Sequence, residues 1–173
     1  MVLGLTIQTF TLVHVIITLI AIASGIVVLL GMVGSHRLPG LTALFLLTTV
    51  LTSVTGFLFP IHGFTPALGV GVISMGLLAV ALFALYARHL AGAWRWIYVV
   101  TAVAALWFNV FVLIIQSFEK VAFLNAKAPQ VGPPFPEPVN THFALTQAAA
   151  LIVIAGLGLI AVLKFRPAPR LAV

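Results

Sequence analysis

From Thr55 to Pro66 the chain reads Thr-Gly-Phe-Leu-Phe-Pro-Ile-His-Gly-Phe-Thr-Pro, a short break between two long apolar runs. Proline lacks a backbone N–H and clashes with the preceding helical turn, whereas glycine adopts backbone angles that other residues avoid. Proline is also common at the first position of a helix. The pattern therefore predicts that one helix ends near Phe59 and the next begins near Pro66, with His62 at the tip of the hairpin.

The chain as a whole is too apolar for a water-soluble domain. Of its 173 residues, 63% are hydrophobic and only 6% are charged, whereas a soluble domain carries about a quarter charged residues. Five apolar runs reach the roughly 20 residues that a helix needs to cross a bilayer, and none alternates as barrel strands do. We place these runs at about residues 7–33, 41–59, 67–87, 96–118 and 143–163. The sequence thus predicts an all-α integral membrane protein, one bundle of five transmembrane helices over residues 1–173.

The connections predict the orientation of the bundle. One of them, at about residues 119–141, is long and holds five prolines, which favours an extended segment over a helix. Lysine and arginine favour the cytoplasmic side of a membrane. Five crossings place six of the eight basic residues on one side, and only Lys120 and Lys127 on the other. We therefore expect the N-terminus outside, the C-terminus in the cytoplasm, and both His62 and the proline-rich loop on the exterior.

Composition also excludes several kinds of chemistry. The net charge of +6 comes from basic residues at the ends of apolar runs, which fits lipid headgroups and gives no reason to expect nucleic-acid binding. The absence of cysteine removes disulfides, thiol catalysis and iron–sulfur sites. The only carboxylates, Glu119 and Glu137, lie at or beyond the predicted outer boundary, which weakens an ion-coupled transporter. No catalytic residue is predicted, and whether the protein is an enzyme stays open.

Polar side chains concentrate in the predicted outer halves of the helices. Buried polar groups are costly in a bilayer and mark functional sites by default. Helical spacing puts Thr52 on one face with Thr48 and Thr55, and Asn109 on one face with Gln116. We expect these faces to form a polar pocket beneath the His62 hairpin. The alternative is that the threonines bond to their own helices and the amides only join helices.

The histidines are predicted to form two layers. His14, His62 and His142 belong to the outer side, where three imidazoles can hold a transition metal ion and two can ligate haem b. We therefore predict these three as metal or cofactor ligands, with Thr52, Asn109 and Gln116 as polar partners. His36 and His89 form an inner layer, where nearby arginines suit haem propionates or simply contact lipid headgroups.

One stretch carries a family resemblance. His14 in the first helix and the turn Ser35-His36-Arg37-Leu38-Pro39-Gly40 give about residues 1–60 a resemblance to uncharacterised small multi-pass bacterial membrane proteins. In that family a first-helix histidine and an H-R-x-x-G turn recur. The resemblance implies a multi-pass protein of the bacterial inner (cytoplasmic) membrane and no particular activity. The layered histidines also resemble those of haem-b membrane cytochromes, although no core helix here carries the paired histidines of several such families.

These observations lead to one functional hypothesis and two alternatives. The leading hypothesis is a small inner-membrane protein that binds haem, a metal ion or a quinone-like hydrophobic ligand in the outer-half pocket. The first alternative is a non-enzymatic subunit or scaffold, which packs against other membrane proteins or its own copies through its helices and proline-rich loop. The second is a passive or facilitated pathway for a small neutral molecule.

Overall fold

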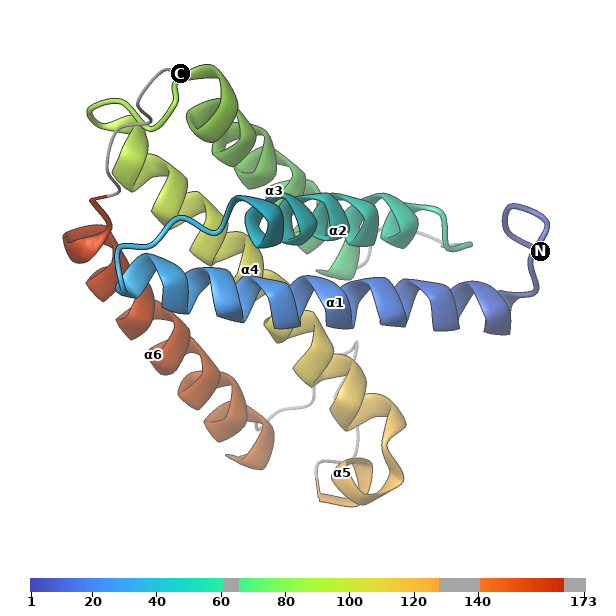
Figure 1. Ribbon diagram of the computed structural model, residues 1–173. Coiled ribbons are helices and arrows are strands. Elements are labelled where there is room, and N and C mark those ends of the chain that lie inside the picture. Colours follow the sequence, from blue (N-terminus) through green and yellow to red (C-terminus); the bar gives the residue numbers. More distant parts are fainter. Residues whose placement is uncertain (61–65, 128–140, 167–173) are drawn as a thin grey trace.

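The computed structural model describes residues 1–60, 66–127 and 141–166, and these residues form helices joined by turns (Figure 1). The helices are α1 (Ile7–Val33), α2 (Pro39–Phe57), α3 (Pro66–Leu82) with a short π-helix η1 (Phe83–Ala87), α4 (Trp94–Lys120), α5 (Ala122–Lys127) and α6 (Thr141–Lys164). Five of the described helical segments are long and apolar enough to cross a membrane. The predicted all-α class and the five candidate spans are therefore confirmed.

The helix ends lie close to the predicted ones, because local sequence signals fix them. Thr6 caps α1 by accepting a hydrogen bond from the Thr9 backbone N–H at 3.1 Å. Pro39 occupies the first turn of α2, which ends at Phe57. Pro66 begins α3 as predicted. The tip of this hairpin, including His62, lies outside the described residues.

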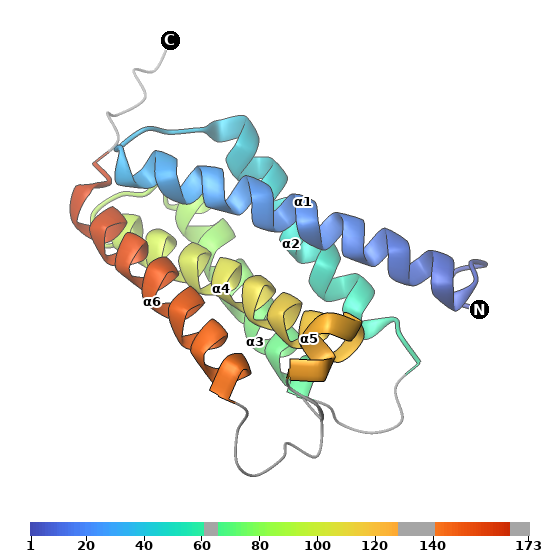
Figure 2. The same ribbon diagram turned by 90° about the horizontal axis from the view of Figure 1, so that it is seen from below.

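Helix α4 is the centre of the bundle and packs against α1, α2, α3 and α6. One side of α4 is almost fully buried and supplies much of the core, through Tyr98, Val99, Ala102, Ala105 and Leu106. Helices α1 and α2 pack extensively along each other, and α4 passes behind α1 in Figure 1. Figures 1 and 2 both show α1 and α6 close together where the two helices end and well separated where they begin.

Basic side chains gather at one end of the bundle, which we call the basic end. It is the end at which α1, α3 and α6 finish and α2 and α4 begin. The basic residues there are Arg37, Arg88, Arg95, Lys164 and Arg166. Lys120 is the last residue of α4, at the opposite end, and Lys127 ends the following helix α5. The antiparallel order of the helices therefore separates the charges as the sequence predicted, although which side of a membrane each end faces stays a prediction.

Glycines allow close helix contacts at particular points. A Cβ at Gly25 would lie 2.8 Å from both Phe45 and Leu106, so α1 meets α2 and α4 there without room for a methyl group. A Cβ at Gly158 would lie 2.8 Å from Val103, at the contact of α6 with α4. Both of these close contacts involve α4.

Two expectations differ from the structure. The connection after α4 was predicted to be extended throughout, but its first part is the helix α5, and its prolines lie outside the described residues. The amide of Asn125 donates to the Phe118 carbonyl at 3.2 Å, which folds α5 back onto the end of α4. Tyrosine and tryptophan near the end of a span favour the membrane interface, which is where Trp94, Trp96 and Tyr98 are expected from their positions, but Tyr98 is only 2% exposed and lies in the core.

Candidate functional site

His14 is joined to α2 through a side-chain hydrogen bond. Its Nδ1 atom lies 2.7 Å from the Thr55 hydroxyl, and that hydroxyl donates its own hydrogen to the Leu51 carbonyl at 2.7 Å. A hydroxyl has one hydrogen to give. With that hydrogen on the Leu51 carbonyl, the hydroxyl oxygen accepts from the imidazole, and in this tautomer the ring hydrogen is on Nδ1. The Nε2 atom then carries a lone pair and makes no hydrogen bond within the described part of the chain. The Phe59 ring packs edge-on against this imidazole at 5.3 Å between centroids.

A second contact between α1 and α2 lies one turn further along. The Thr18 hydroxyl donates to the His14 carbonyl at 2.9 Å and lies 3.3 Å from the Thr52 hydroxyl. Thr52 and Thr55 are thus both directed to α1, as their common helical face predicted.

Asn109 is the polar contribution of α4, and its side chain is buried. Its Nδ2 atom donates to the Thr49 hydroxyl at 3.3 Å, and Thr49 in turn donates to the Phe45 carbonyl. The carboxamide oxygen of Asn109 has no hydrogen-bond partner among residues 1–60, 66–127 and 141–166. Asn109 therefore both joins α4 to α2 and keeps one acceptor available.

The hydroxyl groups divide into two classes. Serine and threonine in a membrane helix commonly donate to the carbonyl four residues earlier. Those that do so here are Thr11, Thr18, Ser24, Thr48, Thr49, Thr55, Thr101, Ser117 and Thr146. Beyond the first four residues of each described helix, the hydroxyls without such a bond are Thr52, Ser53 and Ser74.

These three hydroxyls line one cavity together with His14 and Asn109. The cavity has a volume of about 120 Å³ and lies between α1, α2, α3 and α4, enough for about four water molecules. At 1.5 Å per residue, Asn109 lies roughly 16 Å below the end of α4 at Lys120. The remaining wall is largely apolar and includes Phe57, Leu68, Val70, Phe108 and Val112. A polar pocket is therefore present well inside the bundle, in the half away from the basic end.

The structure brings only some of the predicted site residues to this cavity. His14, Thr52 and Asn109 line it. Gln116 does not, because its amide donates to Glu119 at 3.3 Å. His142 is exposed at the start of α6 and does not line the cavity either. His62 lies outside the described residues, so the convergence of the three histidines stays a prediction.

Sequence reasoning missed three cavity residues, Thr18, Ser53 and Ser74. Ser74 lies on α3, whose other residues are apolar. A signal was available, since a buried serine on an otherwise apolar helix is itself a costly polar group. Among the described residues, no group of three or more His, Asp or Glu side chains is placed to hold a metal ion.

No family model, curated protein or solved structure matches the chain. The proposals below therefore depend on the geometry of the described residues.

Proposed function

We propose that this chain is a small multi-pass membrane protein that binds the polar head of a quinone-like ligand in the cavity of His14, Thr52 and Asn109. The observation that supports this most concerns the hydroxyls beyond the first four residues of each described helix: those that do not bond to their own helices all line this one cavity. Hydroxyls that are not satisfied locally are costly in an apolar environment, and a ligand with polar atoms removes that cost.

The chemistry of the wall favours a ligand with both a carbonyl and a hydroxyl form. Ser53 and Ser74 can donate hydrogen bonds to a quinone carbonyl. The Nε2 lone pair of His14 and the carboxamide oxygen of Asn109 can accept from the hydroxyl of the reduced quinol. The apolar part of the wall, with Phe57 and Phe108, suits the ring of such a ligand.

The size of the cavity distinguishes among the three ligands that the sequence suggested. A porphyrin is far larger than about 120 Å³. A transition metal ion prefers several nitrogen ligands at about 2 Å, and His14 is the only histidine among the described residues that line the cavity. A small planar headgroup agrees best with both observations, so haem and metal binding are not carried further.

Binding of a short-chain benzoquinone to the purified protein in detergent micelles tests the proposal, with isothermal titration calorimetry as the readout. Each lost hydrogen bond is worth about 0.5 to 1.5 kcal/mol, so Ser74→Ala and Asn109→Leu should each weaken binding by roughly three- to tenfold. Thr48→Val is the matched control, because its hydroxyl bonds to its own helix at Leu44 and Phe45. The proposal would be refuted if the benzoquinone did not bind to the unmodified protein, or if its affinity fell equally in the Ser74, Asn109 and Thr48 variants.

The scaffold alternative has its own test at Gly76. This glycine is exposed, and a Cβ there meets nothing within 4 Å in the chain itself. Gly76→Leu therefore leaves the packing of the chain intact and adds bulk only to its outer face. Loss of a membrane complex in this variant, with quinone binding unchanged, would favour the scaffold.

A further inference from the structure

A second and larger cavity lies at the basic end, and no residue lines both cavities. Its volume is about 470 Å³. His36 and Arg37 from the turn between α1 and α2 line its rim, together with Tyr86 and His89 from η1 and the following turn. We propose that this cavity binds the phosphate headgroup of an anionic lipid, with the attached chain along the apolar floor. The histidine and arginine of the H-R-x-x-G turn, which the first cavity does not use, then have a function.

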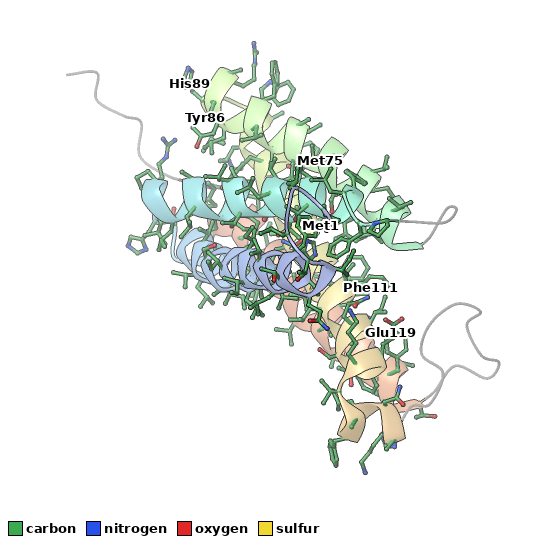
Figure 3. The ribbon with its side chains drawn as sticks, turned by 90° about the vertical axis from the view of Figure 1, so that its right-hand side faces the viewer. Met1, Met75, Tyr86, His89, Phe111 and Glu119 are labelled. Atoms are coloured by element: carbon green, nitrogen blue, oxygen red, sulfur yellow. The ribbon has the colours of Figure 1, made fainter. Side chains whose placement is uncertain are left out.

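The rim carries a positive charge, and no acid among the described residues balances it. Glu119 is the only carboxylate side chain in the described ranges, and Figure 3 shows it far from Tyr86 and His89. Arg37 therefore has no ion-pair partner among the described side chains. A guanidinium group binds two phosphate oxygens at once, and imidazole and phenol groups add further donors. The unpaired donors of the rim fit a phosphate group.

The floor of the cavity indicates that the ligand carries a hydrocarbon chain. It is largely apolar, and its residues include Val28, Met32, Leu85, Leu90 and Phe165. The Tyr98 ring is buried there, with the Thr42 side chain next to its hydroxyl. Free inorganic phosphate gains nothing from such a surface, whereas burial of each CH₂ group stabilises a bound lipid by about 0.8 kcal/mol.

The backbone around the rim is strained at both turns. Ser35, His89 and Leu90 have φ values of 59°, 50° and 61°, a region that residues other than glycine seldom adopt. The Ser35 hydroxyl accepts from the Arg166 backbone N–H at 2.9 Å, and the Leu90 backbone N–H donates to the Ala84 carbonyl at 3.0 Å. Such conformations persist where the surroundings hold them and cluster at ligand sites.

The π-helix η1 adds to this pattern, because π-helical turns occur often at functional sites. It contains Tyr86 and comes directly before His89. Basic pockets between membrane helices on the cytoplasmic side are also known to bind anionic headgroups. Two strained turns, an irregular helix and an unbalanced cation thus lie around a single opening.

Native mass spectrometry of the purified protein in micelles tests the proposal, with phosphatidylglycerol as the probe and phosphatidylcholine and inorganic phosphate as comparisons. We expect phosphatidylglycerol to be retained best, and Arg37→Gln to weaken its binding by roughly tenfold. Arg88→Gln is the matched control: it removes the same charge from the same end, but Arg88 lies over the Trp94 ring and does not line the cavity. The control should change the affinity by less than about twofold.

A second variant keeps the test valid if Arg37→Gln does not fold. Tyr86 is 55% exposed, so Tyr86→Phe preserves the fold and should weaken phosphatidylglycerol binding by roughly threefold. Equal losses of phosphatidylglycerol affinity in the Arg37→Gln and Arg88→Gln variants would overturn the proposal, since the lipid would then be attracted by the overall positive charge of the basic end and not by this cavity. Binding of inorganic phosphate as tight as that of the lipid would overturn the role of the chain. A haem absorption band that disappears in His36→Ala would assign the cavity to another ligand.

Discussion

Among the described residues, the Thr55 hydroxyl makes the one hydrogen bond to the His14 ring and helps to hold it in its observed orientation. Thr55→Val keeps the shape of the side chain and removes the acceptor for Nδ1. We expect the protein to lose about 0.5 to 1.5 kcal/mol of stability, and its affinity for a short-chain quinone to fall because the ring is no longer fixed. Thermal unfolding in micelles and the calorimetric titration measure the two effects. Thr11→Val is the control, since its hydroxyl bonds only to Ile7 of the same helix, and a loss of affinity in that variant would contradict the role given to Thr55.

Arg95 shows that a basic residue at a helix end can also stabilise the bundle. Its Nη1 atom donates to the Val162 carbonyl at 3.1 Å and the Phe165 carbonyl at 2.6 Å, at the end of α6. The last carbonyls of a helix have no partners of their own, and a cation is favoured beside them. Arg95→Gln should therefore speed amide hydrogen exchange in residues 160–166, measured by mass spectrometry. Exchange there as slow as in the unmodified protein would show that the cap contributes little.

At the scale of the element, the contact of α4 with α6 depends on Gly158. An added Cβ there meets Val103 at 2.8 Å, whereas one at Gly156 on the same helix meets nothing within 4 Å. Valine has a strongly preferred rotamer in a helix, so it cannot turn away freely. Gly158→Ala should destabilise the protein by about 1 to 3 kcal/mol, and Gly156→Ala should not. Denaturation of both variants in the same micelles makes the comparison, and equal stability would mean that α6 shifts at little cost.

The bounds of the helices were predictable from the sequence, but which of their faces pack together was predictable only in part. The bounds of α1 are as predicted, because a long apolar run begins after the capping Thr6 and ends before Gly34. Spacing also grouped Thr52 with Thr55, and both meet α1. It grouped Asn109 with Gln116 as well, but only Asn109 reaches the cavity. Helical periodicity identifies one face of one helix, whereas the pairing of faces depends on where glycines allow helices to approach.

The same limit explains why the cavity at the basic end was not predicted. His36 and His89 were placed in one layer, but nothing in the sequence shows that their turns border a common space. The π-helix and the left-handed backbone of Ser35, His89 and Leu90 at the rim arise from tertiary packing, which local propensity does not encode. The helix α5 was missed because the prolines after it dominated the interpretation of the whole connection.

For the whole molecule, the antiparallel order of five helices places two different cavities in opposite halves of one bundle. The smaller cavity holds uncharged donors and acceptors, and the larger one has a cationic rim. Helix α4 contributes to both, through Asn109 and Tyr98. With the basic end in the cytoplasm, the quinone-like ligand is expected in the outer leaflet and the anionic lipid in the inner one.

This orientation can be tested directly, because the chain has no cysteine and single cysteines can be introduced one at a time. Leu3 is 76% exposed near the N-terminus, and Ala91 is exposed in the turn before α4 at the basic end. We expect a membrane-impermeant maleimide to label Leu3→Cys in spheroplasts, and to label Ala91→Cys only after permeabilisation, since lysine and arginine retain the basic end in the cytoplasm. Labelling of Ala91→Cys alone in intact spheroplasts would show that the orientation is the reverse of the predicted one. The cationic cavity would then face the opposite leaflet from the one in which anionic lipids are expected.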